Sequence, residues 1–187
     1  MTQNYNALNF PIYKTIEFLH EFFSNSEKFK YMDSEDLTKI FIREKNSINI
    51  NAIDTRPVIA VSRGSTRFGN VVMGNFWKMD KQTGEETFVD SAQTNMNISC
   101  LAKNGAVAEE IASAVFGAFK FNRQYILSKG FIRMTPPAVS EEQIIRADSD
   151  IEIINVSVVF DVGYLIRWTR KPKNVYTVGE VVFQVEQ

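Results

Sequence analysis

The feature that most constrains this chain is a change of hydrophobic period in its second half. Apolar and polar side chains alternate over about 94–101 and again over about 151–168, which is typical of strands with one buried and one wet face. Between these stretches, residues 105–129 repeat apolar side chains at helical spacing. The first alternation sets Met96, Ile98 and Cys100 against Asn95, Asn97 and Ser99. Since one chain holds both periods, we expect an α+β fold.

The helical segment carries start and stop signals. Asn104 or Gly105 can cap its N-terminus, and the acidic pair Glu109–Glu110 lies near the positive end of the helix dipole. Lys129–Gly130 is a typical helix end. The apolar face is made of Val107, Ile111, Val115, Ala118, Phe119 and Ile126. We therefore predict one major helix that packs on the sheet.

The other elements are shorter. Helices are predicted over 11–24 and, briefly, over 34–41, and strands over 58–62, 70–77, 87–101, 131–135, 151–168 and 175–185. The connections include a turn or loop at 63–69, a hairpin turn at 80–86, an acidic connector after Ser140 and a basic turn at 170–174. The apolar pair Ile153–Ile154 breaks the alternation and predicts a bulge or bend.

This order predicts an α+β architecture: an antiparallel or mixed β-sheet with a long hairpin, packed against one major helix, plus an N-terminal helical element. The 187 residues suit one structural unit. We divide it into an N-terminal arm and helical element, 1–55, and an α+β core domain, 56–187. The 15 phenylalanines predict a sizeable aromatic core or contact surface.

Scarce residues limit the chemistry. With one cysteine, Cys100, neither an intrachain disulfide nor a cysteine-based zinc cluster can form. The one histidine, His20, would have to serve any protease-like site. We interpret Cys100 as a core residue and His20 as a solvated or hydrogen-bonded residue at a helix border. The acidic pairs 85–86, 109–110 and 141–142 are adjacent in sequence and do not face a common point. We predict no catalytic, metal-binding or cofactor-binding residues and no enzyme activity.

The segment Arg63–Gly69 is the nearest approach to a phosphate-binding loop. Its amides and two arginines suit an anion, but its spacing matches no phosphate fingerprint, and a turn explains it better. The chain also shows no signal peptide and no apolar run of the roughly 18 residues that a membrane helix needs. We therefore expect no membrane contact and a cytoplasmic default location.

Charge is unevenly distributed although the net charge is −1. Residues 56–78 are basic without an acid, residues 141–161 are mostly acidic, and residues 167–173 are basic around Trp168. Solvated strand faces and turns are one explanation. Complementary patches between subunits are another, because such patches fix register. A contact of the last segment with a nucleic-acid backbone is a third, which the neutral total charge disfavours.

Four features together resemble a known family: the strand TNMNISCL, the helix AVAEEIASAVFGAF, the short strand after Gly130 and the strand IEIINVSVVFDVGYLIRW. They resemble the tail terminators and related head–tail joining (neck) proteins of tailed bacteriophages over about residues 56–170. The resemblance implies a virion subunit, assembled in the host cytoplasm, that forms a cyclic homo-oligomer, typically a hexameric ring. Such a ring caps the tail tube, ends its polymerisation and joins it to the head connector. It implies no cofactor and no enzymatic activity.

The partners implied are further copies of the chain, the tail tube protein, the sheath protein in some tails, and a head–tail connector or neck protein, with non-specific DNA contact in the lumen. The candidate interface residues are Trp77, Lys78, Asp80, Lys81, Glu85, Glu86, Arg167, Trp168, Arg170, Lys171 and Lys173. Two alternatives stay open: another head-completion, neck or baseplate component, and a small phosphate- or nucleotide-binding domain that uses Arg63–Gly69.

Overall fold

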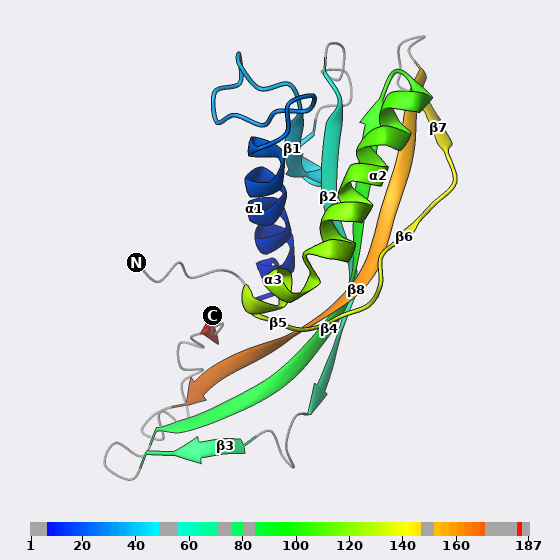
Figure 1. Cartoon of the computed structure of the whole chain (residues 1–187). Helices are drawn as coiled ribbons and strands as arrows, with labels where there is room; N and C mark the ends of the chain where they lie inside the picture. The colour runs from blue at the N-terminus through cyan, green and yellow to red at the C-terminus, as the bar shows by residue number, and fades with distance from the viewer. Residues whose placement is uncertain are drawn as a thin grey trace.

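A computed structural model describes residues 7–48, 56–70, 76–80, 85–146, 152–170 and 183–184 (Figure 1). Its helical elements are α1 (Phe10–Ser24), the 3-10 turn η1 (Lys45–Ser47), α2 (Gly105–Phe121) and α3 (Arg123–Ser128). Its strands are β1 (Phe41–Glu44), β2 (Val58–Asn70), β3 (Phe76–Met79), β4 (Glu86–Ala102), β5 (Phe131–Met134), β6 (Ala138–Val139), β7 (Gln143–Arg146), β8 (Glu152–Arg170) and β9 (Phe183–Gln184). The predicted helix over 11–24 and the predicted hairpin and long strands are confirmed.

The strands form one mixed sheet, in the order β1-β2-β4-β8-β5. Only the pairing of β1 with β2 is parallel among those described. β3 adds to β4, while β5, β6, β7 and β9 pair in turn with β8. The α+β prediction with an antiparallel or mixed sheet is thus confirmed, in its mixed form.

The two central strands pair without interruption. β4 and β8 stay in register from Glu86 opposite Arg170 to Ala102 opposite Ile154. β7 also pairs in register with β8 at Ile153 and Ile154, so of the predicted bulge or bend the bulge is wrong. Ile154 packs against the main core, whereas Ile153 is buried in a second cluster with Val58, Ala60 and Leu101. Both faces of the sheet are covered at this end. Ile153 and Ile154 can therefore both be buried, on opposite faces, without a bulge in the strand.

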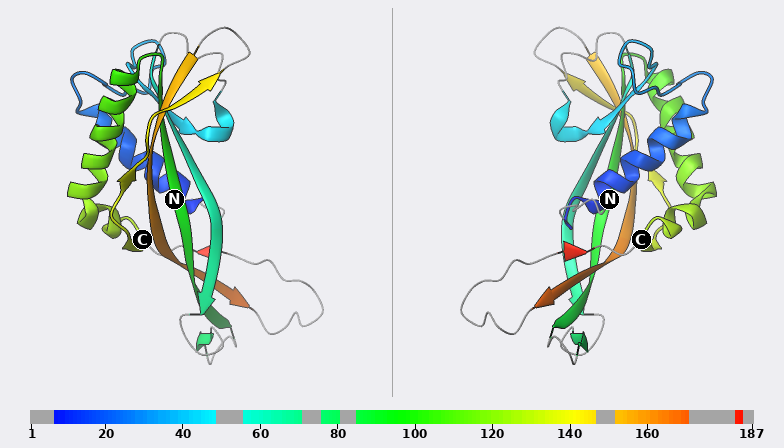
Figure 2. Two further views of the ribbon diagram at one scale, coloured as in Figure 1. Left: turned by 90° about the vertical axis from the view of Figure 1, so that its right-hand side faces the viewer. Right: turned by 90° about the vertical axis from the view of Figure 1, so that its left-hand side faces the viewer.

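The main core lies between the sheet and the helices. Figure 2 shows α1 and α2 on one side of the strands and η1 on the other. Met96, Ile98 and Cys100 are fully buried on the helix side, as the alternation predicts. The predicted aromatic core is present: the ring of Phe119 lies 5.0 Å from that of Phe18 and 4.6 Å from that of Phe160. Apolar side chains of α1 and α2 belong to this same cluster, which therefore joins the N-terminal element to the core domain.

The ends of α2 follow their sequence signals. The side-chain oxygen of Asn104 accepts a hydrogen bond of 2.9 Å from the amide of Ala106, which caps the helix. The predicted helix over 105–129 divides at Asn122, whose side-chain amide donates to the carbonyl of Ala118 at 2.9 Å. α3 then ends before Gly130, which has a φ of 109°. Glycine tolerates this left-handed region because it has no Cβ.

The short helix predicted over 34–41 is wrong. The chain makes turns there and enters β1, whose amide at Phe41 donates to the carbonyl of Pro57. Ile40 and Ile42 are buried at a spacing of two, whereas Leu37 is 62% exposed. Pairing with β2 satisfies the backbone, and this tertiary interaction overrides the helical spacing of the apolar residues.

Two connections also differ from expectation. The predicted turn or loop at Arg63–Gly69 is wrong, because β2 continues through it with a register shift between Arg63 and Thr66. The acidic connector after Ser140 contains β7, which pairs with the start of β8. The strand predicted over 175–185 lies outside the described residues except at 183–184, where β9 pairs with β8. Among the helices described, none is long and apolar enough to cross a membrane.

Candidate assembly surface

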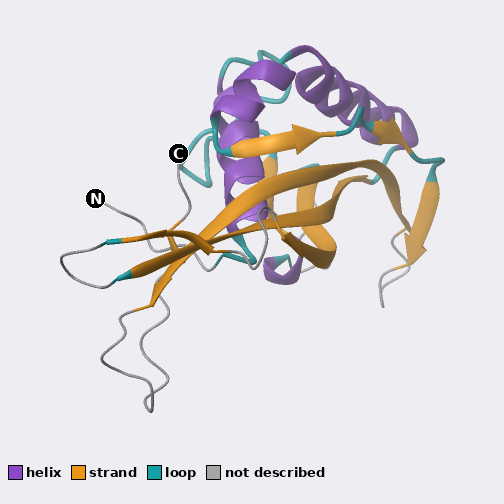
Figure 3. Ribbon diagram, turned by 90° about the horizontal axis from the view of Figure 1, so that it is seen from below, coloured by secondary structure: helices purple, strands orange, loops and turns teal. Residues whose placement is uncertain are grey.

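The sheet extends well beyond the helices. Figure 1 shows β4 and β8 running on below α3, with β3 beside the far end of β4. Figure 3 shows the same strands projecting from the helical body when seen from below. We call this projection the arm and define it as Phe76–Met79, Glu86–Asp90 and Ile166–Arg170. No helix among the described residues covers it.

The arm brings together the two candidate interface segments that the sequence singled out. Glu86 pairs with Arg170, 84 positions later in the chain, and Lys78 pairs with Thr87, so β3 and β8 both flank β4. The amide of Asp80 donates to the carbonyl of Glu85 at 2.8 Å, which draws the two sides of the hairpin together. Trp77 lies in β3, and Arg167 and Trp168 lie in β8. Lys81, Lys171 and Lys173 lie outside the described residues.

The centre of the arm is an aromatic pair. The rings of Phe88 and Trp168 stack with centroids 4.1 Å apart and planes 9° apart. The indole Nε1–H of Trp168 donates to the carboxylate of Asp90 at 3.1 Å. Phe88 and Asp90 were not among the predicted site residues. Both lie in the predicted strand, but only the register with β8 shows that they meet Trp168.

The arm leaves large apolar side chains in contact with solvent. Phe88 and Trp168 are only half-buried, and Met79 is exposed. Phe68, at the adjoining end of β2, is 60% exposed. Charged groups of both signs surround them, from Lys78 and Asp80 to Arg167. Partly exposed aromatic residues among charges are typical of a protein contact surface.

A small polar pocket lies where β2 shifts register. Its volume is about 190 Å³, and it is lined by Ser65, Arg67, Gln93, Thr94, Asn95 and Asp161. The amide of Asn95 donates to the carboxylate of Asp161 at 3.1 Å. The guanidinium of Arg63 donates to the hydroxyl of Thr66 at 3.1 Å and so already has a partner within its own strand. A carboxylate in the wall disfavours an anion, so this geometry gives little support to phosphate binding.

The lone cysteine is a core residue, as predicted. Cys100 is fully buried, and burial raises the pKa of its thiol to about 12. His20 is half-buried, and its ring stacks on Tyr31 with centroids 3.8 Å apart. Its Nε2–H donates to the carbonyl of Ile42 at 3.3 Å, and burial lowers its pKa. These contacts confirm the interpretation of His20 as a hydrogen-bonded helix residue and explain how it ties α1 to β1.

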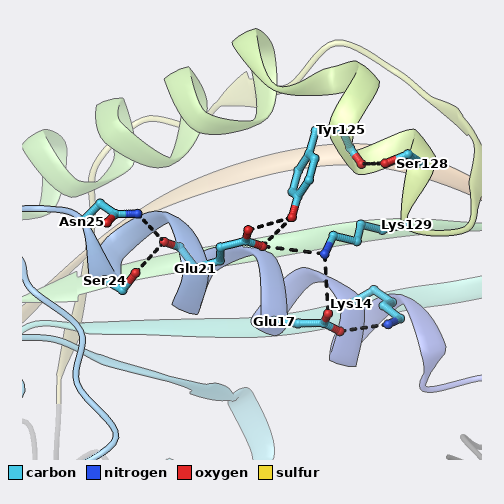
Figure 4. Close-up of polar contacts among 8 residues, drawn as sticks. All are labelled: Lys14, Glu17, Glu21, Ser24, Asn25, Tyr125, Ser128 and Lys129. Atoms are coloured by element: carbon cyan, nitrogen blue, oxygen red, sulfur yellow. Dashed lines mark hydrogen bonds and ion pairs between the residues drawn. The ribbon is translucent and has the colours of Figure 1, made fainter.

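The acids on α1 also have structural partners, which Figure 4 shows. The hydroxyl of Tyr125 donates to the carboxylate of Glu21 at 2.7 Å. The ammonium of Lys129 lies 3.7 Å from Glu21 and 3.8 Å from Glu17. This group fixes α1 against α3. Elsewhere Glu110 pairs with Lys28 at 2.5 Å, and in the described part of the chain no three His, Cys, Asp or Glu side chains gather as a metal site.

Neither a protein-family model nor a curated protein sequence matches this chain. The arm and the strand edges therefore have to be interpreted from their own geometry.

Proposed function

We propose that this protein is a virion structural subunit of a tailed bacteriophage, similar to a tail terminator. In this role it forms a ring, a hexamer like that of the tail terminators it resembles, that caps the tail tube and joins it to the head connector. It acts by shape and surface complementarity, without catalysis or a cofactor. Its partners are its own copies, the tube protein and the connector.

The observation that carries this proposal is the arm. Two segments that the sequence selected on charge and aromatic content gather at one projecting end of the sheet. The aromatic pair of Phe88 and Trp168 gives this end a half-buried apolar centre with charges around it. A closed ring repeats one heterologous interface, and an arm that leaves its own body suits contact with a neighbouring subunit or with the tube.

Two other functions were considered. A different head-completion, neck or baseplate component would use the same surface, and the position of the protein in an assembled particle distinguishes it. A phosphate- or nucleotide-binding domain loses the loop on which it rested, since Arg63–Gly69 belongs to a strand and Asp161 lines the adjacent pocket.

The test is the assembly state of the purified full chain. Native mass spectrometry and negative-stain imaging are expected to show a cyclic oligomer, alone or after addition of the tail tube protein of the same phage. A strictly monomeric protein under both conditions would contradict the proposal. The paired variant Phe88→Ala with Trp168→Ala is expected to weaken assembly or tube binding, whereas Phe121→Ala on α2 serves as a control for loss of an exposed aromatic residue.

A further inference from the structure

The sheet has one edge that ends abruptly. β1 pairs with β2 only from Val58 to Val61, and among the described residues no strand flanks the outer side of Thr66–Asn70. This stretch is regularly paired with β4 on its inner side. Its Phe68 is 60% exposed and its Arg67 is exposed. An unflanked strand of this length is a template for pairing with another strand.

The opposite edge consists of β5, β6 and β7, which follow one another along β8. At β5 this edge is protected: the guanidinium of Arg123 donates to the carbonyl of Met134 at 3.1 Å, and Pro136–Pro137 offers no amide. Beyond the prolines it is open. Val139 is 48% exposed and Ile144 is 62% exposed, and no described strand lies outside them.

Backbone groups point outward at both edges. The amide of Ser140 donates to the carbonyl of Ser157 on β8, so the carbonyl of Val139, in the same peptide unit, points away from β8. The hydroxyl of Ser91 on β4 donates to the carbonyl of Gly69 at 2.9 Å. The amide of Asn70, in the same unit as that carbonyl, therefore points away from β4. One edge thus presents a donor and the other an acceptor.

The directions of the strands are compatible with pairing to a second copy of the chain that is related to the first by rotation. β2, β4, β8 and the β5–β7 row alternate in direction, because each of these pairs is antiparallel. The first and last rows of four alternating strands run in opposite directions. A second copy turned about a ring axis therefore brings its β2 antiparallel to β6 and β7 of the first copy.

We infer that subunits join by strand pairing, with Thr66–Asn70 of one copy adding to Val139–Gln143 of the next. This inference rests on the proposed ring and names its interface. With Asn70 opposite Val139, the basic Arg67 lies opposite Glu142, whose carboxylate lies against Gly105 at the start of α2, and one residue from Glu141. The two edges therefore carry opposite charge. The pairing also covers the exposed side chains of Phe68 and Val139.

The alignment implies a stagger between neighbouring copies along the strands. Thr66 is level with Val162 through β4, whereas Gln143 is level with Asn155. The neighbour is therefore displaced by seven residues along β8 at this end of the alignment, roughly 23 Å at about 3.3 Å per residue. At the other end Asn70 is level with Ile166 and Val139 pairs with Val158, a displacement of eight, because the pairing with β8 shifts by one residue between β6 and β7. Closed sheets require such a stagger, because their strands are inclined to the axis. In the neighbouring copy, β1 covers its own β2 only up to Val61. In this alignment Val61 lies beyond Arg146, the last residue of β7 in the first copy, so β1 does not occupy the place of β7.

Disulfide cross-linking of the full chain tests this interface. Arg67→Cys is combined with Glu141→Cys or with Glu142→Cys, and the buried Cys100 remains as a silent thiol. Oxidation of at least one double variant is expected to give a ladder of covalent species that ends at the subunit number of the ring. The single variants are expected to give none, because a heterologous interface does not bring a position next to itself. Covalent dimers from Arg67→Cys alone would overturn the inference in favour of a two-fold contact.

Charge reversal provides an independent measurement. Arg67→Glu is expected to raise the dissociation constant of the assembly at least tenfold, whereas Arg133→Glu on the protected strand β5 leaves it within twofold. Circular dichroism and the melting temperature establish that both variants fold. A ring that persists in native mass spectrometry without a ladder and without an effect of Arg67→Glu overturns the strand pairing while the proposed function stands. A wild-type protein that stays monomeric both alone and with the tube protein overturns both.

Discussion

Two phenylalanines of α2 provide the sharpest test of the packing. Phe119 is almost fully buried and lies between the rings of Phe18 and Phe160, at centroid distances of 5.0 and 4.6 Å. Phe121, two residues later in the same helix, is 80% exposed. Replacing each by alanine removes the same atoms from opposite environments.

The expected effects differ widely. Phe119→Ala leaves a cavity in the main core, and a buried Phe→Ala substitution costs about 3–5 kcal/mol. For a chain of this size each kcal/mol shifts the melting temperature by about 2–4 °C, so the expected fall is roughly 6–20 °C. Phe121→Ala changes no buried contact of the chain and is expected to stay within about 0.5 kcal/mol of the wild type.

The assay is urea unfolding followed by circular dichroism, with thermal melts at the same protein concentration. The concentration is held fixed because assembly raises apparent stability. Equal losses for the two variants would refute the placement of α2 on the sheet, because the helix would then have another face inward. A loss at Phe121 that vanishes on dilution would instead locate this residue in a subunit contact.

Three further predictions concern titration and backbone geometry. Cys100 is expected to resist a thiol reagent at pH 8 until the chain unfolds. Because burial raises its pKa in the folded state to about 12, the free energy of unfolding falls as pH rises above 9.0, the ordinary pKa of a thiol. Burial lowers the pKa of His20, so stability is lost as pH falls below 6.5, and His20→Gln is expected to flatten this part of the unfolding profile. Gly130→Ala is expected to lower stability by about 1–2 kcal/mol in urea unfolding, because φ is 109° there, whereas Gln124→Ala at an exposed position of α3 is the matched control.

Alternation and helical spacing carry the central part of the fold. Residues 94–101 and 151–168 alternate strongly, and the capped segment after Asn104 has one apolar face, so β4, β8 and α2 follow from local pattern. β1 does not follow from local pattern, because four residues are too few to show a hydrophobic period. It is a strand because it pairs in parallel with β2. The apolar residues from Leu37 to Phe41 have helical spacing by coincidence, while the signal that matters is the spacing of two between Ile40 and Ile42.

Glycines explain the wrong prediction of a turn at Arg63–Gly69. Gly64 and Gly69 suggest a turn, yet both lie within β2. Next to Gly64 the strand shifts register and continues, and a Cβ added there would make only ordinary contacts with Asn95. At Gly69 an added Cβ would lie 3.1 Å from the hydroxyl of Ser91, so a small residue suits the close approach of β4. Local sequence cannot distinguish a glycine that ends a strand from one that lets a partner approach.

The candidate site shows the same division between local and long-range information. Trp168 stands out in the sequence because basic residues surround it, but Phe88 and Asp90 do not stand out. Their contact with Trp168 depends on the register of β4 and β8, which places Phe88 opposite Trp168. These two residues are 80 positions apart in the chain. Register is set by all the pairs of the two strands together, so no window along the sequence contains it.

The unbroken register also decides how the arm behaves mechanically. Its strands are the same β4 and β8 whose other halves are packed beneath α1 and α2, with no register shift between the two parts. A strand pair that continues from a packed core leaves few backbone torsions free to act as a hinge, so the arm is held in the orientation that the core dictates. A contact at Trp168 is therefore placed relative to the free edge at Thr66–Asn70 by the sheet itself. In a ring built through that edge, the arms of all subunits project at one fixed angle, which gives the assembly a repeating surface for a partner of the same symmetry.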